Sequence, residues 1–391
     1  MKAPLRVSNL ARAIEPTLIR VLRGGMKPTT IDFGLGQTDL AVTDVIRADF
    51  QKRFNEPIRA PYTPNAGIDA AREAVARHVG VAPEEVLLTC GVQEGLAVAI
   101  LGLCDPGDEV LVPDPGFPAY ANLVRAAGAH PVEYPLRQPS PGHQKWDLDS
   151  QSILDRITDD TKLVILNNPG NPTGSVYSKK ALIEVMAGLK ERGVGWVSDE
   201  IYEDYIWEGS FYPARRADAE AGGAPGGITL SGLSKSHHLM GWRLGWMIAP
   251  AEVVKELTPL HQHLVTCAPL PAQEAAITAL AHHQEAINET LEVLGARRKR
   301  ALEVLQGLGV IALEGASGAF YLFLDVRKFL PTFDTTRQMA ETLLEEEDVL
   351  AIPGEGFGPS GLGHLRVAYT IGGDPLEDGL GRLRRFLVRH Q

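Results

Sequence analysis

The sequence is poor in cysteine, in positive charge and in long apolar runs, and each shortage excludes a class of protein. Its three cysteines lie far apart without a CxxC pair, which argues against a disulfide framework and against a cysteine zinc site. No stretch approaches the roughly 20 apolar residues of a membrane helix, and the N-terminal residues lack the apolar core of a signal peptide. We therefore expect a cytoplasmic protein that does not enter membranes.

Acidic residues outnumber basic ones by 49 to 38, and the formal net charge is −11. This balance argues against general binding to nucleic acid or to anionic membranes, although it leaves room for one local phosphate site. The P-loop, HExxH and GxSxG patterns are absent, which argues against a nucleotide-binding protein, a zinc protease and an α/β-hydrolase. At 391 residues, the chain is long enough for two domains.

Apolar strand-like stretches alternate with helical stretches over much of the first two thirds of the chain. The predicted strands are residues 85–90, 108–115, 161–169, 194–200 and 226–235, and the predicted helices are 93–104, 119–129 and 179–193. Apolar strands joined by helical crossovers predict an α/β fold with a mostly parallel sheet covered on both faces. Four of the strands end in polar clusters (TCG, NNPGNPTG, SDEIY and SGLSK), at the sheet edge where ligands bind in such folds.

The pattern changes after Pro269, where residues 271–309 predict one or two long helices. Residues 318–326 and 364–370 predict strands of a smaller α+β domain. We predict three parts: an N-terminal arm over residues 1–40, a large domain over 41–280 and a small domain over 281–391. The arm is expected to pack with the small domain or with a partner subunit.

Lys235 lies between small residues in SGLSKSHHLMGWRLGW, and Arg243 follows eight residues later. A lysine attacks carbonyls only when burial or neighbouring cations disfavour its ammonium form. A small-residue loop admits a bulky aldehyde, and an arginine can hold a phosphate with two hydrogen bonds. Asp199 ends a predicted buried strand, so its carboxylate requires an arginine, a metal or a protonated heterocyclic nitrogen, of which the metal has the least support.

Asn171 lies between Gly170 and Pro172, which restrict its backbone on both sides. Its amide and the hydroxyl of Tyr202 could both donate to one phenolate-type oxygen. The histidine pairs of the chain lack a matching carboxylate arrangement, so we predict no metal site.

These motifs resemble, in order and spacing, the class I/II aminotransferases, which are pyridoxal-phosphate (PLP) enzymes of fold type I. The resemblance is carried by NPTG (171–174), DEIY (199–202), SGLSK (231–235) and the arginine eight residues beyond the lysine. It extends over most of the chain through YTPNAG (62–67), TCGVQEGL (89–96), PDPGFPAY (113–120), PGEGFG (353–358) and LRVAYT (365–370). The resemblance implies a seven-stranded sheet between helices in the large, PLP-binding domain.

The resemblance also implies roles for individual residues. Lys235 would form the Schiff base with the cofactor and move the proton, Asp199 would pair with the ring nitrogen, and Tyr202 would assist at the ring oxygen. The other implied cofactor contacts are Asn171 at that oxygen, Phe117 on the ring face, and Val92, Gln93, Ser231, Ser234 and Arg243 at the phosphate. Tyr62 would reach the phosphate of a neighbouring subunit in a homodimer. Arg366, with the backbone near Gly36 and with Asn171, would bind the substrate carboxylate.

The expected function is transfer of an amino group from an L-amino acid to a 2-oxo acid by a ping-pong mechanism. One alternative keeps the same cofactor chemistry, as a C–S β-lyase or a cyclopropane-forming synthase, and another is a regulator that has lost catalysis. The segment GLGQTDL (34–40) stands where many relatives have a G-x-P-D segment that touches substrate, so the preferred side chain stays open.

Overall fold

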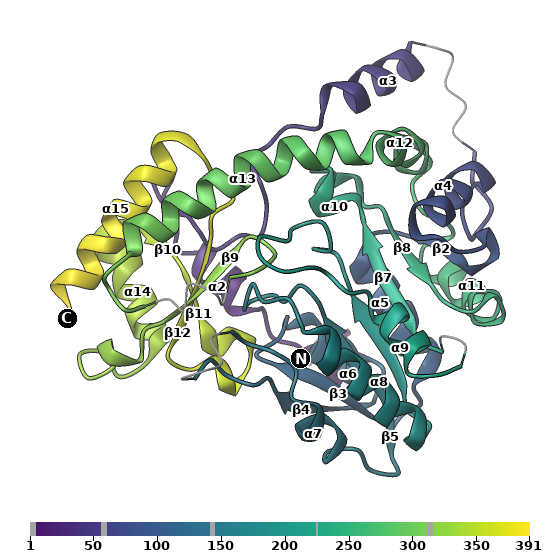
Figure 1. Ribbon diagram of the computed structural model, residues 1–391, viewed down its shortest axis with the longest axis horizontal. Coiled ribbons are helices and arrows are strands. Elements are labelled where there is room, and N and C mark those ends of the chain that lie inside the picture. The colour runs from purple at the N-terminus through teal and green to yellow at the C-terminus, as the bar shows by residue number, and fades with distance from the viewer. Residues whose placement is uncertain (1–4, 56–60, 141–144, 224–225, 311–315) are drawn as a thin grey trace.

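A seven-stranded sheet forms the centre of the computed structural model, which describes residues 5–55, 61–140, 145–223, 226–310 and 316–391 (Figure 1). The strands lie in the order β2-β8-β7-β6-β5-β3-β4, and only β8 runs antiparallel to its neighbours. Their bounds are β2 Val86–Thr89, β3 Glu109–Asp114, β4 His130–Pro135, β5 Thr161–Asn167, β6 Gly195–Asp199, β7 Ile228–Gly232 and β8 Gly245–Ile248. The mostly parallel α/β sheet predicted from the alternating pattern is therefore confirmed.

Helices cover both faces of this sheet. One face packs against α5 (Val92–Leu103), α6 (Ala119–Ala126) and α11 (Ala251–Val265) in a single apolar cluster. The other face carries two separate clusters, one under α7 (Ser150–Leu154), α8 (Lys179–Arg192) and α9 (Ala214–Glu220) and one under α4 (Asp69–Val79) and α12 (Leu270–Ala281).

Local sequence signals explain where individual elements begin and end. Ser178 caps α8 by accepting a hydrogen bond from the Ala181 amide, and Gly193 ends the helix with φ +66°. Both are the residue types that these positions favour. In β5, six of the seven residues are buried, as expected of a central strand covered on both faces.

The C-terminal part consists of long helices and small sheets. The helices are α13 (His283–Leu305), α14 (Thr336–Glu347) and α15 (Gly373–Arg389), and α13 crosses the upper part of the molecule in Figure 1. A three-stranded sheet has the order β11-β12-β9, with β9 Tyr321–Asp325, β11 Ile352–Pro353 and β12 His364–Ala368. Short 3-10 turns occupy Pro83–Glu85, Met240–Trp242, Arg327–Phe329, Gly354–Phe357 and Pro359–Gly361.

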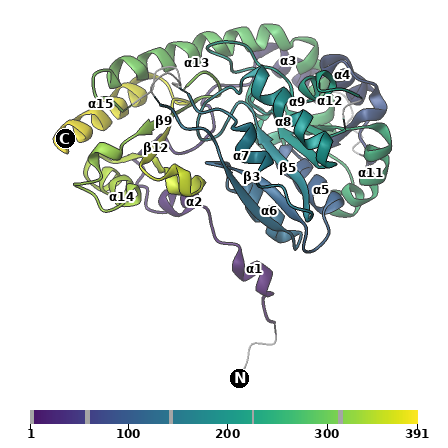
Figure 2. The ribbon, with the colours of Figure 1, turned by 60° about the horizontal axis from the view of Figure 1, so that its bottom comes forward.

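The N-terminal residues contact this C-terminal part before the chain enters the large sheet. Strand β1 (Ile31–Asp32) pairs in parallel with β10 (Val349–Leu350), and α2 (Leu18–Arg23) lies beside β11. The short helix α1 (Asn9–Ala13) projects away from the body in Figure 2, and α3 (Asp44–Phe54) projects from the other side in Figure 1. The division of the chain at residues 40 and 280 stays a prediction.

The prediction of one strand over residues 226–235 is wrong at its end. Strand β7 stops at Gly232, and Leu233–Ser236 form the single helical turn α10, which carries Lys235. The strand ends there because no neighbouring strand pairs with it further on: its pairing with β8 ends at Gly232 and its pairing with β6 ends at Leu230. Lys235 therefore stands beyond the sheet edge on a short helix rather than on a strand.

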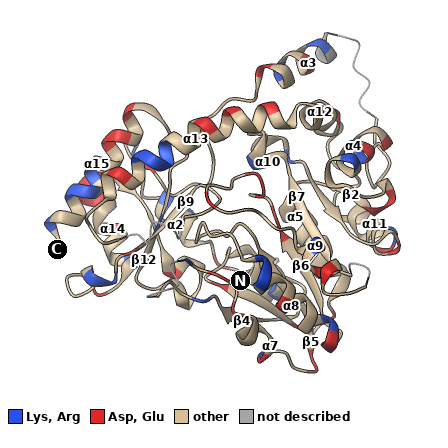
Figure 3. Cartoon of the chain, in the orientation of Figure 1, with Lys and Arg blue, Asp and Glu red and all other residues tan. Residues whose placement is uncertain are grey.

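Acidic and basic residues are interspersed along α13 and α15 (Figure 3). Several of them form pairs, such as Arg300 with Glu377 at 2.7 Å and Arg382 with Asp378 at 2.7 Å. Such exposed pairs contribute little individually to stability. Within the described ranges, no helix combines the length and the apolar character needed to cross a bilayer.

Candidate active site

A cavity of about 600 Å³ lies at the carboxyl ends of β5 and β6, between the large sheet and the C-terminal part. It brings together most of the residues that the sequence had singled out from distant positions. Those lining it are Gly36, Val92, Gln93, Phe117, Asn171, Asp199, Tyr202, Ser234, Lys235, Arg243 and Arg366.

The Lys235 ammonium lies inside this cavity, and its Nζ donates to the backbone carbonyl of Gly36 at 2.6 Å. Burial and the nearby cation Arg366 lower the pKa of Lys235 to about 8, with a smaller contribution from Arg243, and this value already includes the opposing effect of Asp199. At pH 7 about one tenth of an amine with this pKa is uncharged, far more than of an ordinary lysine, and the uncharged amine is the state that can attack a carbonyl.

Asp199 is the last residue of β6 and is only 6% exposed. Its Oδ2 accepts from the Tyr120 hydroxyl at 2.9 Å, and its Oδ1 accepts from the Ile201 amide at 3.2 Å. Burial raises the pKa of Asp199 to about 6, and these hydrogen bonds together with Lys235 hold it below what burial alone would give. A cation placed against this carboxylate would keep it ionised.

One end of the cavity is built to receive an anion. Helix α5 starts at Val92, and the Glu94 and Gly95 amides donate to the Gly91 carbonyl. The Val92 and Gln93 amides have no acceptor among the described residues, and both residues line the cavity. Gly91 precedes it with φ +83°, and a Cβ at Gly91 would lie 2.4 Å from the Arg243 Nη2. Arg243 donates only to the carbonyls of Met240 and Cys90 among the described contacts, so its charge is free to meet an anion.

Another part of the cavity wall is formed by Arg366, which is 1% exposed. Its Nη1 donates to Asn171 Oδ1 at 2.8 Å and its Nη2 donates to the carbonyl of Gly34. Its Nε has no partner, and among the described residues no carboxylate forms a salt bridge with it. A buried cation without a counter-ion is costly, so this part of the cavity favours a ligand carboxylate.

Two tyrosines and a glycine complete the wall near Lys235. The hydroxyls of Tyr202 and Tyr321 lie 2.8 Å apart, and the guanidinium of Arg366 lies 4.6 Å from the centroid of the Tyr321 ring. A Cβ at Gly36 would lie 2.0 Å from the Tyr321 hydroxyl, so only glycine fits there.

Three of these supporting residues were missed by the sequence analysis. Tyr120 lies inside the motif PDPGFPAY, which was noted without a role for its last residue. Asn167 accepts from the Asn171 amide at 2.8 Å and donates to the Asp199 carbonyl at 3.1 Å, and it belongs to the quoted NNPGNPTG stretch. Tyr321 carried no signal beyond its place in an apolar strand.

Two of the predicted cofactor contacts do not line the cavity. Ser231 belongs to the opposite side of β7, where it lines a second cavity and donates to Glu203 at 2.5 Å. The reason is strand alternation, because Ser231 and the neighbouring Leu230 point to opposite faces of the sheet. Tyr62 is 84% exposed on the surface of this chain.

The chain is similar to known aminotransferases along almost its whole length. The family model described as aminotransferase class I and II matches residues 28–378. An aspartate aminotransferase of Pyrococcus horikoshii is 31% identical over 385 residues, which cover 96% of this chain and 95% of that one. A probable N-acetyl-LL-diaminopimelate aminotransferase of Bacillus subtilis is 32% identical, with 97% and 95% of the two chains covered.

Solved structures give the same result. An alanine aminotransferase from Pyrococcus furiosus superposes with a TM-score of 0.88 at 29% identity, covering 98% of this chain and 100% of that one. An aspartate aminotransferase from Thermus thermophilus with maleate gives a TM-score of 0.86 at 30% identity, with the same shares covered. The matching sheet, the cavity at its edge and these similarities lead to one assignment: the chain belongs to the class I and II aminotransferase family.

Proposed function

We propose that this protein is a PLP-dependent aminotransferase that moves an amino group from an L-amino acid to a 2-oxo acid in two half-reactions. One observation carries the proposal: a single cavity holds an amine of lowered pKa, a buried carboxylate and two separate cationic groups. The function class agrees with the family, whose members depend on PLP in general.

The residues present fit this cofactor. Its phosphate would be held by the free amides at the start of α5, by Arg243 and by Ser234. Arg243 can reach the phosphate position because Gly91 has no Cβ to block its guanidinium. Phe117 lines the same cavity and would lie on the ring face. Asn171 and Tyr202 would donate to the ring oxygen. Ser231 is left out of this set because it faces the second cavity.

When bound, PLP supplies an aldehyde that bonds to amines and an aromatic ring that withdraws electrons from the adjacent carbon. Lys235 would be the residue bonded to it, and its Nζ, once released, would take the proton from the substrate Cα and deliver it, as a general acid, to the carbon that the aldehyde contributes. Asp199 would hold a proton on the ring nitrogen, because its buried carboxylate has only neutral hydrogen-bond donors among the described residues.

Arg366 would orient the substrate by binding its α-carboxylate, with Asn171 and the backbone near Gly36 beside it. This contact fixes the direction of the Cα–H bond relative to Lys235, which is the positioning that the reaction requires. The unpartnered Nε of Arg366 and its lack of a salt bridge among the described residues support this role.

We also propose a homodimer in which Tyr62 reaches the cavity of the neighbouring subunit. Tyr62 is 84% exposed, and the N-terminal arm exposes Leu5, Val7 and Leu10 to 90%, 59% and 43%. Burial of these side chains against a second copy would remove apolar surface from water. Each subunit of this two-subunit enzyme would then consist of the arm, the large domain up to residue 280 and the small domain after it.

The alternative reactions have less support. A C–S β-lyase or a cyclopropane-forming synthase would use the same amine and carboxylate, but the relatives compared above are named as aminotransferases. A regulator that has lost catalysis would have no need to keep Lys235, Asp199 and Arg366 together in one cavity.

The function is tested with an amino acid labelled with ¹⁵N and an unlabelled 2-oxo acid. We expect the label to appear in the amino acid that corresponds to the added 2-oxo acid, because the enzyme stores the nitrogen between the half-reactions. The measurement is mass spectrometry of the free amino acids over a panel of donors and acceptors. Release of ammonia and pyruvate from a sulfur-containing amino acid, without label transfer, would favour the β-lyase instead.

A further inference from the structure

His238 follows Lys235 by three residues and combines an unusual backbone conformation with a buried side chain. Its φ is +58°, in the left-handed region that residues other than glycine seldom adopt. The residue is 8% exposed, so its ring is enclosed by its neighbours. A residue held in a rare backbone conformation beside a candidate catalytic group points to a function for its side chain.

Both ring nitrogens of His238 face threonine hydroxyls. Nδ1 lies 2.8 Å from Oγ1 of Thr38, and Nε2 lies 3.0 Å from Oγ1 of Thr290 on α13. The Thr290 hydroxyl donates to the Ala286 carbonyl at 2.9 Å, so its oxygen accepts from the ring, and we assign the ring hydrogen to Nε2. Nδ1 is then an acceptor, and the Thr38 hydroxyl donates to it.

The ring is neutral in this arrangement. Burial lowers the pKa of His238 to about 4, against the opposing charge of Asp39 and with a smaller contribution from Arg297. A neutral imidazole has one donor and one acceptor, which matches the two hydroxyls that it meets. The hydrogen bonds therefore run in one direction, from Thr38 through His238 to α13.

Thr38 stands at a point where the sequence departs from many relatives. The segment GLGQTDL (34–40) has Gly36 and Asp39 at the glycine and the aspartate of G-x-P-D, which places Thr38 at the proline. Proline has no hydroxyl and could not donate to the His238 ring. The bond from Thr38 to His238 is therefore a feature that the common pattern does not contain.

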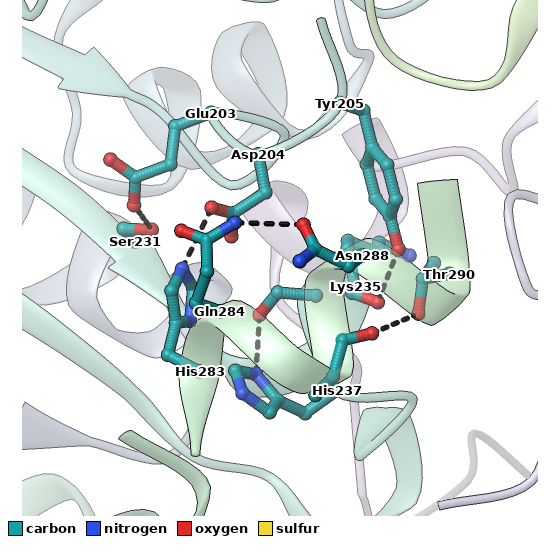
Figure 4. Close-up of polar contacts among 12 residues, drawn as sticks. Glu203, Asp204, Tyr205, Ser231, Lys235, His237, His283, Gln284, Asn288 and Thr290 are labelled. Atoms are coloured by element: carbon teal, nitrogen blue, oxygen red, sulfur yellow. Dashed lines mark hydrogen bonds and ion pairs between the residues drawn. The ribbon is translucent and has the colours of Figure 1, made fainter. Parts of the chain in front are cut away.

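The turn that carries Lys235 is held by its neighbours. The Tyr205 hydroxyl donates to the Lys235 carbonyl at 2.6 Å, as Figure 4 shows. The His238 amide donates to the same carbonyl at 3.4 Å. Helix α10 contacts α13, where Thr290 lies (Figure 4). His238 therefore offers Thr38 a fixed point of attachment.

Residues 34–40 form part of the wall of the catalytic cavity, and the Gly36 carbonyl accepts from Lys235 Nζ at 2.6 Å. Among the described residues, two hydrogen bonds join this segment to the turn that carries Lys235: this one and the bond from Thr38 to His238. Under the proposed function, Nζ leaves Gly36 when it bonds to the cofactor. The bond from Thr38 to His238 is then the one that can persist.

We propose that Thr38 and His238 are positioning residues for amino transfer. Their hydrogen bond keeps the Gly36 carbonyl and the backbone around it in place while the Lys235 amine is engaged elsewhere, so that the substrate carboxylate meets Arg366 against an unchanged wall. This inference rests on the proposed function, in which the backbone near Gly36 helps to bind that carboxylate. Neither positioning residue lines the cavity, so their loss should weaken substrate binding and leave the cofactor bound.

The first measurement is the affinity of the holoenzyme for the α-methyl analogue of the best amino donor. This analogue has no Cα–H bond, so it binds without completing the reaction, and a spectrophotometric titration gives its Kd. Thr38→Val keeps the side-chain shape without the hydroxyl, and Kd should rise about tenfold. His238→Gly should have a similar effect, because glycine suits φ +58° and only the ring is lost.

Matched variants separate this hydrogen bond from general damage. Thr38→Ser keeps the donor and should stay within about twofold of the unaltered protein. Thr38→Val combined with His238→Gly should bind no more weakly than either single variant, because both remove the same bond. Thr332→Val makes the same chemical change at an exposed position and should have no effect.

Steady-state kinetics should show the same division. Thr38→Val should raise the KM of the donor about tenfold and change kcat by less than about threefold, because the bond supports substrate binding. Cofactor content should equal that of the unaltered protein.

A second measurement observes the ring without relying on amino transfer. In protein with ¹⁵N-labelled histidine, NMR should show His238 as the neutral tautomer with its hydrogen on Nε2. The signal is identified by its loss in His238→Gly, and Thr38→Val should shift the Nδ1 resonance because that nitrogen loses its donor.

The proposal is overturned if Thr38→Val leaves the Kd of the analogue unchanged, if Thr38→Ser weakens binding as much as Thr38→Val, or if the variants lose cofactor instead. A His238 ring with its hydrogen on Nδ1 would also overturn it. Each of these results in a protein that transfers amino groups refutes this inference alone. Failure of the unaltered protein to transfer any label would refute the proposed function itself.

Discussion

Replacing Lys235 with alanine is expected to lower the rate of amino transfer by a factor of at least about 1,000. The change removes both the amine that would bond to the cofactor and the group that would move the Cα proton, and positioned acid–base groups alone contribute about 100- to 10,000-fold. The measurement is kcat for the best amino donor and 2-oxo acid found in the labelling panel.

The control is Lys255→Ala, which removes an exposed lysine from α11 and should keep full activity. Circular dichroism and thermal unfolding should show that both variants fold, because alanine suits the helical turn α10. An active Lys235→Ala protein would mean that another group performs the chemistry.

The variant Asp199→Asn is expected to lower kcat by about 150- to 5,000-fold. Asparagine has nearly the same shape and could still accept from Tyr120, but it carries no charge to hold a proton on the ring nitrogen. Loss of one partner from a buried ion pair costs about 3–5 kcal/mol, which sets the size of the effect.

Asp159→Asn makes the same chemical change at an exposed position between α7 and β5 and should leave kcat unaltered. Steady-state kinetics at saturating substrate, with cofactor content measured for each protein, separates a slower reaction from lost cofactor. If Asp199→Asn turned over at the rate of the unaltered protein, the carboxylate would have no part in stabilising the cofactor.

The sequence predicted the central part of the fold because its strands carry strong signals. The apolar runs that became β2, β3, β5 and β6 are short and end in polar residues. Strand β4 was missed because HPVEYP holds two prolines and partly exposed residues, which an edge strand tolerates. Strand β8 was missed because it is short and follows a motif that was interpreted only for its arginine.

The candidate site was predictable where one residue type is required at a fixed spacing, as for Lys235 and Asp199. It was not predictable where the direction of a side chain decides which cavity a residue faces. Ser231 and Ser234 both lie in SGLSKS, but strand alternation sends Ser231 to the second cavity and the turn after Gly232 sends Ser234 to the first. The second cavity itself arises from residues of five separate segments, so no local pattern could reveal it.

The central claim is that Lys235, opposite the buried Asp199, bonds covalently to PLP. The most direct measurement is reduction of the purified holoenzyme with borohydride, followed by digestion and mass spectrometry of the peptides. We predict that the mass of the reduced cofactor is found on Lys235 alone and that the Lys235→Ala protein carries none. Cofactor mass on a different lysine, or on no peptide at all, would contradict the account.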